Sequence, residues 1–309
     1  MRIIFFTNYF LSGNKLKEFQ KESIDCLVNA INKGRDANIK TEAVIKVSKK
    51  DFSFFKNFFK DNQYINVYSL AERSSNKRLP YIEDIINSID LSKSIYSNQL
   101  KFNEIDFCIY ANSDICITPY FFEFIRDLIY LDKKKISEGK KTNEIISYVI
   151  NRKDVINSDM KKRNLFEDKE LIFKDHPGYD LFIFKSSILK YFSLGEVCIG
   201  TPPIGQIFIL NLIILSDEVK IIKKFLLSWH RGSDKPWKKL NTEINRNEIS
   251  AIKALINLSK KEDVKLLNLK TKGFEINLLN STLAHIGIHR KKSFLKKLFN
   301  YLRKIINNI

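Results

Sequence analysis

Three polar residues, Asn112, Ser113 and Asp114, follow a mostly apolar run at 105–111 that is typical of a buried strand. A carboxylate at such a strand end can hold a divalent cation, because the strand fixes its position and the loop leaves coordination sites for phosphate oxygens. The same residue types also fill ordinary turns, since Asn and Asp side chains hydrogen-bond to nearby backbone. Taken alone, the triplet favours a turn, with a metal site as the alternative.

A second polar group stands at the start of another apolar run, in the sequence KDHPGYDLFIFKSS at 174–187. Asp180 precedes the aromatic strand of that segment, and a carboxylate there could remove a proton from an attacking hydroxyl. The alternative is structural: Asp180 could cap the turn or form an ion pair with Lys174 or Lys185.

The segment SWHRGSDKPW at 228–237 places many site-type residues in one short loop after an apolar strand. His230 could be a metal ligand, because imidazole is a common one. Arg231 or Lys235 could contact a diphosphate, and Trp237 could stack on a sugar ring. A lone histidine is more often structural, but the company of these residues favours a functional loop.

Other segments give weaker signals. The loop GTPPIGQIF at 200–208 could form one wall of an acceptor pocket or be a plain turn, and it lacks the Lys-Ser/Thr of a Walker loop. Two basic pairs, Lys77 with Arg78 and Arg152 with Lys153, are expected just outside a helix start or strand end. There they could meet phosphates or face water.

The elements that must position these residues alternate along the chain. Apolar patterns predict strands over 2–6, 43–47, 65–70, 105–111, 145–150, 181–184 and 219–227, and helices over 15–33, 80–89, 119–131 and 204–215. The charged segment at 132–144 predicts a loop or helix end, and a lysine-rich loop is expected before 181. This alternation indicates an α/β, Rossmann-like open sheet, mostly parallel and flanked by helices. Ligands bind such sheets at the carboxyl ends of the strands, where Asn112 lies.

Composition sets broader limits. With 309 residues and 44% apolar content the chain can form a large globular core. The net charge of +18 would attract polyanions, although an AT-rich coding sequence would also enrich lysine. The four cysteines lack zinc-ligand spacing and suggest reduced thiols in the cytoplasm. The most apolar segment, 204–215, is roughly half the ~20 residues that cross a bilayer, so no membrane span is expected.

The C-terminal segment at 286–309 differs from the domain expected over 1–285. One helical face of this tail is apolar, with Phe294, Leu295, Leu298, Leu302, Ile305 and Ile306. Its flanks are basic, with Lys291, Lys292, Lys296, Lys297, Arg303 and Lys304. Such a basic amphipathic helix can lie on an anionic membrane surface. It could also dock on the domain with its lysines in water.

The order of these motifs over residues 1–240 resembles bacterial glycosyltransferases of the GT-A fold, in a branch with an Asn-Ser-Asp variant of the DxD motif. The resemblance implies a Mn²⁺ or Mg²⁺ ion held by Asn112, Asp114 and His230, with Asp180 as the general base of an inverting enzyme. It implies that the end of the first strand contacts the nucleotide. The full set of donor-binding residues expected is Thr7, Asn8, Tyr9, Arg78, Arg152, Arg231 and Lys235. The acceptor-binding residues expected are His176, Gly200 and Trp237.

The activity implied is transfer of a sugar from a nucleotide-sugar donor to a hydroxyl of a glycan or lipid-linked acceptor. This suits an enzyme of cell-surface polysaccharide biosynthesis that is cytoplasmic, peripheral on the inner membrane face and bound to anionic lipid through its tail. A retaining route remains open if Asp180 orients the donor. Two alternatives are a nucleic-acid-binding protein or metal-dependent nuclease, and an inactive sugar-binding domain. No helix-turn-helix, RRM or zinc-finger signature is present, so no nucleic-acid partner is expected.

Overall fold

The computed structural model describes residues 1–75, 79–86, 106–139, 145–155, 173–230 and 241–259. Four residues expected at the site, Arg78, Arg231, Lys235 and Trp237, lie outside this part of the chain. The tail at 286–309 also lies outside it, so its helix and the division of the chain at residue 285 stay predictions.

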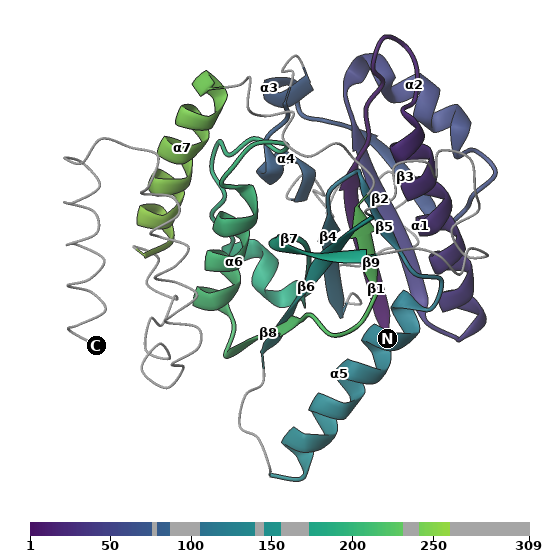
Figure 1. The fold of residues 1–309 in the computed structure, drawn as a ribbon, viewed down its shortest axis with the longest axis vertical. Helices are drawn as coiled ribbons and strands as arrows, with labels where there is room; N and C mark the ends of the chain where they lie inside the picture. The colour runs from purple at the N-terminus through teal and green to yellow at the C-terminus, as the bar shows by residue number, and fades with distance from the viewer. Residues whose placement is uncertain (76–78, 87–105, 140–144, 156–172, 231–240, 260–309) are drawn as a thin grey trace.

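The strands of the described residues form one curled sheet (Figure 1). They are β1 Arg2–Asn8, β2 Lys40–Val47, β3 Ile65–Ser69, β4 Phe107–Ala111, β5 Ile115–Ile117, β6 Ile146–Val155, β7 Phe173–Lys185, β8 Glu218–Ile222 and β9 Ser228–His230. The order is β3-β2-β1-β4-β7-β6-β9-β5, with β8 also paired to β6. Pairing is parallel from β3 to β4 and from β6 to both β8 and β9. It is antiparallel where β7 joins β4 and β6, and where β5 joins β9.

Helices cover both faces of this sheet. They are α1 Glu18–Asp36, α2 Lys49–Phe58, α3 Glu72–Ser75, α4 Ile82–Ile86, α5 Phe121–Ser137, α6 Ile204–Leu215 and α7 Asn241–Ser259, with a 3₁₀ helix at Ser186–Tyr191. One apolar layer joins the sheet to α1, α2 and α5, and the other joins it to α4, α6 and α7. The alternation of side chains along a strand divides β1 between the layers, with Phe5 in the first and Phe6 in the second. This arrangement confirms the predicted α/β class with a mostly parallel, helix-flanked sheet.

The predicted elements are largely confirmed, and the helix at 204–215 has the predicted bounds. Its side chains are apolar on nearly all sides because it lies between β7 and α7, as Figure 1 shows. The segment at 132–144 begins as the end of α5, which continues to Ser137. Among the described helices, none is long and apolar enough to cross a membrane.

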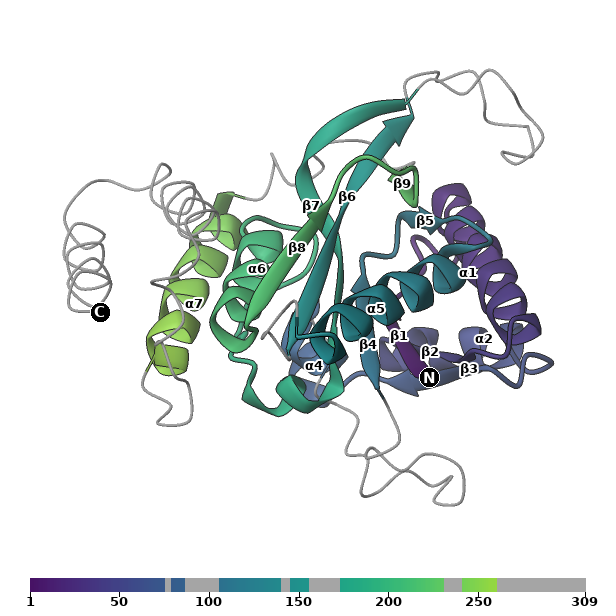
Figure 2. The ribbon, with the colours of Figure 1, turned by 90° about the horizontal axis from the view of Figure 1, so that it is seen from below.

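Two predictions about strands were wrong. The strand expected over 219–227 ends at Ile222, and residues 228–230 form the separate strand β9. The expected lysine-rich loop is in part strand, because β6 and β7 pair as far as Val155 and Phe173 and form a long two-stranded arm (Figure 2). Apolar periodicity misses this arm because its outer part carries charged residues, which look like a loop.

Lys46 lies at the carboxyl end of β2 and is only 2% exposed. Its ammonium nitrogen is 4.6 Å from the centre of the Tyr68 ring. Burial lowers the pKa of Lys46 from 10.5 to about 8, although the negative charge of Asp84 opposes this change. A charged lysine is therefore held in the fold at a cost in stability.

We expect Lys46→Met to increase the free energy of unfolding by about 1–3 kcal/mol at pH 7, since each unit of pKa shift is worth about 1.4 kcal/mol. The unfolded chain holds the Lys46 proton up to about pH 10.5, whereas the folded chain releases it near pH 8. The free energy of unfolding of wild type should therefore rise relative to that of the variant as pH increases from 8 to 10.5. Urea denaturation across this range measures the difference.

The control is Lys40→Met at the exposed start of the same strand, which removes one positive charge without removing a buried one. A difference between wild type and Lys46→Met that does not change between pH 7 and pH 10 would contradict the prediction.

Candidate functional site

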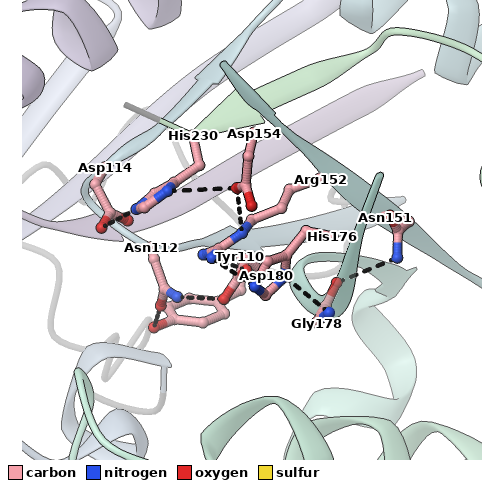
Figure 3. Close-up of polar contacts among 10 residues, drawn as sticks. All are labelled: Tyr110, Asn112, Asp114, Asn151, Arg152, Asp154, His176, Gly178, Asp180 and His230. Carbon is pink, nitrogen blue, oxygen red and sulfur yellow. Dashed lines mark hydrogen bonds and ion pairs between the residues drawn. The ribbon is translucent and has the colours of Figure 1, made fainter. Parts of the chain in front are cut away.

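A set of polar side chains meets where β4, β6, β7 and β9 lie beside one another (Figure 3). Asn112 and Asp114 follow β4, Asp180 lies on β7, and His230 ends β9. Backbone pairing brings them together: the Asn112 N–H donates to the Asp180 carbonyl oxygen at 3.4 Å, and Ile115 is paired with His230. The structure thus brings together polar groups that the sequence places far apart.

Asp180 is the centre of the first half of this site. Its Oδ1 accepts a hydrogen bond from Asn112 Nδ2 at 2.8 Å, and its Oδ2 lies 2.9 Å from Arg152 Nη1. Burial raises the pKa of Asp180 above its ordinary value, while the Arg152 charge opposes that rise and the nearby charge of Asp114 adds to it. Asp180 is therefore a carboxylate with fixed orientation and more basic character than an exposed aspartate.

Asn112 has a defined orientation. Tyr110 donates its hydroxyl hydrogen to Asn112 Oδ1 at 2.9 Å, which leaves the amide nitrogen to face Asp180. A carboxylate can only accept at this contact, so the donor must be the Asn112 amide. An aspartate at position 112 would instead place a second negative charge against Asp180. This contact explains physically why the triplet begins with asparagine.

Arg152 lies inside β6, so its expected place just outside a strand end was wrong. The pairing of β6 with β7 is irregular at residues 150–153, and such bulges re-aim a side chain. Arg152 forms an ion pair with Asp180. Its Nη2 lies 3.0 Å from His176 Nε2, and its Nε lies 3.3 Å from Asp154 Oδ1. Its guanidinium therefore links three groups of the site.

His176 lies next to Arg152, within β7 and four residues before Asp180, where the pairing of β7 with β6 is irregular. The Gly178 N–H donates to His176 Nδ1 at 2.8 Å. A neutral imidazole accepts a hydrogen bond at only one of its two nitrogens. His176 can therefore accept from Gly178 at Nδ1 or from Arg152 at Nε2, but not from both at once. A Cβ on residue 178 would come within 2.7 Å of His176 Cε1, so the ring can adopt this position only beside a glycine.

The second half of the site is an imidazole between two carboxylates. His230 Nε2 is 3.0 Å from Asp114 Oδ2, and His230 Nδ1 is 3.6 Å from Asp154 Oδ1. Burial alone would raise the pKa of Asp114, but the hydrogen bond and charge of His230, with the charge of Arg152, lower it below the ordinary value. Asp114 is therefore ionised at neutral pH. Asp154, next to both His230 and Arg152, connects the two halves.

The groups at Asp114 and His230 fit a divalent cation that is shared with a ligand. Among the described residues, no three His, Cys, Asp or Glu side chains gather to hold a metal by themselves. Mg²⁺ and similar ions often bind through one or two protein groups plus substrate phosphates. An ionised carboxylate next to an imidazole supplies such a partial set. Asn112 points instead toward Asp180 and Tyr110, as Figure 3 shows.

The predicted donor residues of β1 lie at its carboxyl end. Thr7 and Asn8 are buried there, and within the described structure the Thr7 hydroxyl has no hydrogen-bond partner. Tyr9 has a packing role: its ring stacks on Phe55, and its hydroxyl lies 3.1 Å from Ser23 Oγ. Donor contact by these residues stays a prediction, and the geometry favours Thr7 and Asn8.

The segment at 200–208, whose second half is the start of α6, lies beside β7 at Tyr179, the residue before Asp180. A Cβ on Gly205 would come within 2.7 Å of the Tyr179 carbonyl oxygen, so the start of α6 approaches β7 very closely. Gly200 has φ +73°, a conformation that glycine adopts without strain. Asn247 of α7 bonds both the N–H and the C=O of Cys198 just before this loop. A helix that the sequence analysis did not predict therefore holds the predicted acceptor wall.

Sequence reasoning missed several members of the site. Tyr110, Asp154 and Gly178 were not predicted, because a tyrosine in an apolar strand and an aspartate in a lysine-rich segment carry no local signal. At 152–154 the sequence shows only two basic residues followed by an acidic one, Arg-Lys-Asp, which is common on exposed segments.

Comparisons with known proteins are limited to folds. The sequence matches no protein-family model and no curated protein. The structure is similar to Staphylococcus aureus TarS 1–349 in complex with UDP, at 12% identity and TM-score 0.48, over 92% of this chain and 71% of that one. It covers 54% of a longer TarS chain at TM-score 0.43. Another similar structure is the inositol-1-phosphate CTP transferase of T. maritima, at 12% identity and TM-score 0.39, over 79% of this chain and 96% of that one. At these values the similarities carry no argument about activity.

We expect Asn112→Asp to destabilise the fold by roughly 1–3 kcal/mol at neutral pH, because it replaces a donor to Asp180 with a second carboxylate. The additional acid should not tighten Mn²⁺ binding, since position 112 faces Asp180 instead of Asp114. Urea denaturation measures the stability, and Mn²⁺ titration calorimetry measures the affinity.

The control is Asn57→Asp, which adds the same charge at an exposed position of α2. A variant Asn112→Asp that is as stable as wild type and binds Mn²⁺ more tightly would show that the triplet acts as an acidic metal motif.

Proposed function

We propose that this protein is a glycosyltransferase that moves a sugar from a nucleotide-diphosphate donor to a hydroxyl of a glycan or lipid-linked acceptor, with Mn²⁺ or Mg²⁺ as cofactor. One observation carries the proposal: a pair suited to a cation, Asp114 with His230, lies beside a separate buried carboxylate, Asp180, that Arg152 and Asn112 orient. Such a transfer needs both a group that binds the diphosphate and a base for the acceptor.

On the donor side, Asp114 and His230 would hold the cation. When bound, this ion neutralises negative charge on the nucleoside diphosphate as it leaves. Asp154, 3.6 Å from His230 Nδ1, would orient the imidazole from behind, as carboxylates commonly do for histidine ligands. Thr7 and Asn8, at the end of β1, are the groups proposed to meet the nucleotide.

On the acceptor side, Asp180 would take the proton of the attacking hydroxyl. That oxygen forms the new bond to the anomeric carbon as the bond from this carbon to the diphosphate oxygen breaks. Asn112 contacts Oδ1 of Asp180 and Arg152 contacts Oδ2. Each oxygen therefore keeps a second lone pair that can accept the proton. Attack opposite the leaving group inverts the anomeric centre. His176, which shares the partner Arg152 with Asp180, and the segment from Gly200 to Gly205, whose end lies against Tyr179, are proposed to contact the acceptor.

The first test is donor binding. A panel of nucleotide sugars in thermal shift assays with and without Mn²⁺ should give one donor whose stabilisation requires the metal. Asp114→Ala should abolish this metal-dependent shift while leaving the melting temperature without ligands within a few degrees. Ser113→Ala next to it is the control, because it leaves the carboxylate in place.

The alternatives predict other outcomes. No response to any donor, together with salt-sensitive binding of RNA or DNA, would favour a nucleic-acid-binding protein or nuclease. Donor binding without transfer to any acceptor would favour a sugar-binding domain. Donor affinity and metal dependence unchanged in Asp114→Ala would exclude Asp114 as a metal ligand.

The second test concerns the base. We expect Asp180→Asn to keep donor binding within a few-fold and to lower the transfer rate by a factor of roughly 10²–10⁴, the usual contribution of a general base. In wild type the rate should rise with pH as Asp180 loses its proton, at a pH above the ordinary aspartate value of 3.8, because burial raises the pKa. Arg152→Gln should move this rise to higher pH, since the Arg152 charge lowers that pKa.

The measurement is the rate of sugar transfer against pH for the three proteins at saturating donor. Full transfer by Asp180→Asn would eliminate Asp180 as the base, whereas loss of donor binding as well would assign it to the donor side.

A further inference from the structure

The connection between β8 and β9 carries large apolar side chains on the protein surface. Phe225 is 53% exposed and Leu226 is 39% exposed, and Tyr120 at the start of α5 is 61% exposed. Phe225 lies against Phe124 of α5, with ring centres 5.2 Å apart, so the loop and the helix start form one surface. We call Tyr120, Phe225 and Leu226 the Phe225 patch.

The backbone holds this loop in place. The Leu227 carbonyl oxygen accepts the Thr118 N–H at 3.1 Å, and the Leu227 side chain is buried. The Leu227 N–H donates back to the Phe225 carbonyl oxygen at 3.1 Å, which closes a tight turn. Exposure of Phe225 and Leu226 is therefore a property of a fixed loop whose neighbouring residue anchors it in the core.

Positive charge adjoins the patch. Lys223 and Lys224 immediately precede Phe225, and both are exposed. On the α5 side the acidic residues are Glu123 and Asp127, and Asp127 forms an ion pair with Arg126 at 2.8 Å. Aromatic and leucine side chains beside lysines suit the boundary of an anionic bilayer, where rings enter the headgroup region and ammonium groups meet lipid phosphates.

We infer that the Phe225 patch with Lys223 and Lys224 docks the folded domain on an anionic lipid surface. The same loop leads directly into β9, which carries His230, so the surface lies on the chain segment that supplies the site (Figure 2). Docking here would bring the site to the membrane independently of the tail at 286–309. The inference does not require the proposed transfer activity, because lipid binding can be measured without donor or acceptor.

The experiment uses the full chain with one fluorescent label. All four native cysteines are buried, so Phe225→Cys introduces a single accessible thiol for an environment-sensitive dye. Vesicles of phosphatidylcholine with phosphatidylglycerol should shift the emission of this label to the blue, and pure phosphatidylcholine vesicles should not. The matched control is Phe58→Cys, labelled on α2, where the native ring is 48% exposed.

A label at residue 225 that shifts while the label at 58 does not would support docking through this surface. If the protein binds the vesicles but the label at 225 does not shift, the proposal is overturned and the binding belongs to other segments. Equal shifts at both positions would also overturn it, as would a shift at 225 with RNA but not with vesicles.

A second measurement uses unlabelled protein in vesicle co-sedimentation. Lys223→Gln with Lys224→Gln should weaken binding to the anionic vesicles on the order of tenfold to thirtyfold, given about fivefold for each lysine near such a surface. The control pair Lys133→Gln with Lys134→Gln removes two exposed charges from α5, farther along the helix. Equal losses in the two pairs would indicate attraction to overall charge and contradict a specific surface. The Lys223→Gln with Lys224→Gln variant should transfer sugar to a soluble acceptor at the wild-type rate. This measurement distinguishes a loss of lipid binding from a loss of the proposed activity.

Discussion

The rest of the site depends on one buried carboxylate, Asp180, and on the groups that make its burial tolerable. An ionised carboxylate loses hydration inside a protein, so it needs a charge or donors to replace water. Arg152 supplies the charge and Asn112 supplies a directed donor. Because these partners come from β6 and from the end of β4, on either side of β7, the contact ties the central strands together at the place where chemistry is proposed.

The constraint extends to the cation side through shared partners. Arg152 also faces Asp154, and Asp154 faces His230, which lies against Asp114. The two ends also act on each other through charge: Asp114 raises the pKa of Asp180, and Arg152 lowers the pKa of Asp114. Neighbouring titratable groups whose pKa values move apart are typical of sites where acid, base and charge-binding roles are divided.

The sheet accounts for this division. Parallel strands β1 and β4 bring their carboxyl ends to one edge, which is the usual place for ligands in such sheets. Antiparallel β7 lies beside β4 from Leu181 onward, so Asp180, just before that pairing begins, meets Asn112 just after the end of β4. The antiparallel pairing therefore places a residue from the middle of β7 beside the end of β4.

Apolar periodicity was sufficient for the α/β class, for the helix at 204–215 and for the position of Asn112 at a strand end, because burial dictates these patterns locally. It failed where residues on the two-stranded arm of β6 and β7 are polar, and where α7 docks a mostly polar helix on the core. The candidate residues Asp114, Asp180 and His230 were found from their types at apolar-run boundaries. Asp154 and Tyr110 were missed because their roles depend on partners from other strands.

By itself, the sequence determined where the apolar runs of the sheet lie and which chemical groups border them, since both depend on neighbours along the chain. Only the tertiary structure decided that Asn112 serves Asp180, a residue 68 positions away, and that Asp114 pairs with His230, 116 positions away. The physical reason is that hydrogen bonds and charge pairs act through a few ångströms of space. Local sequence does not encode which strand ends will lie within that distance.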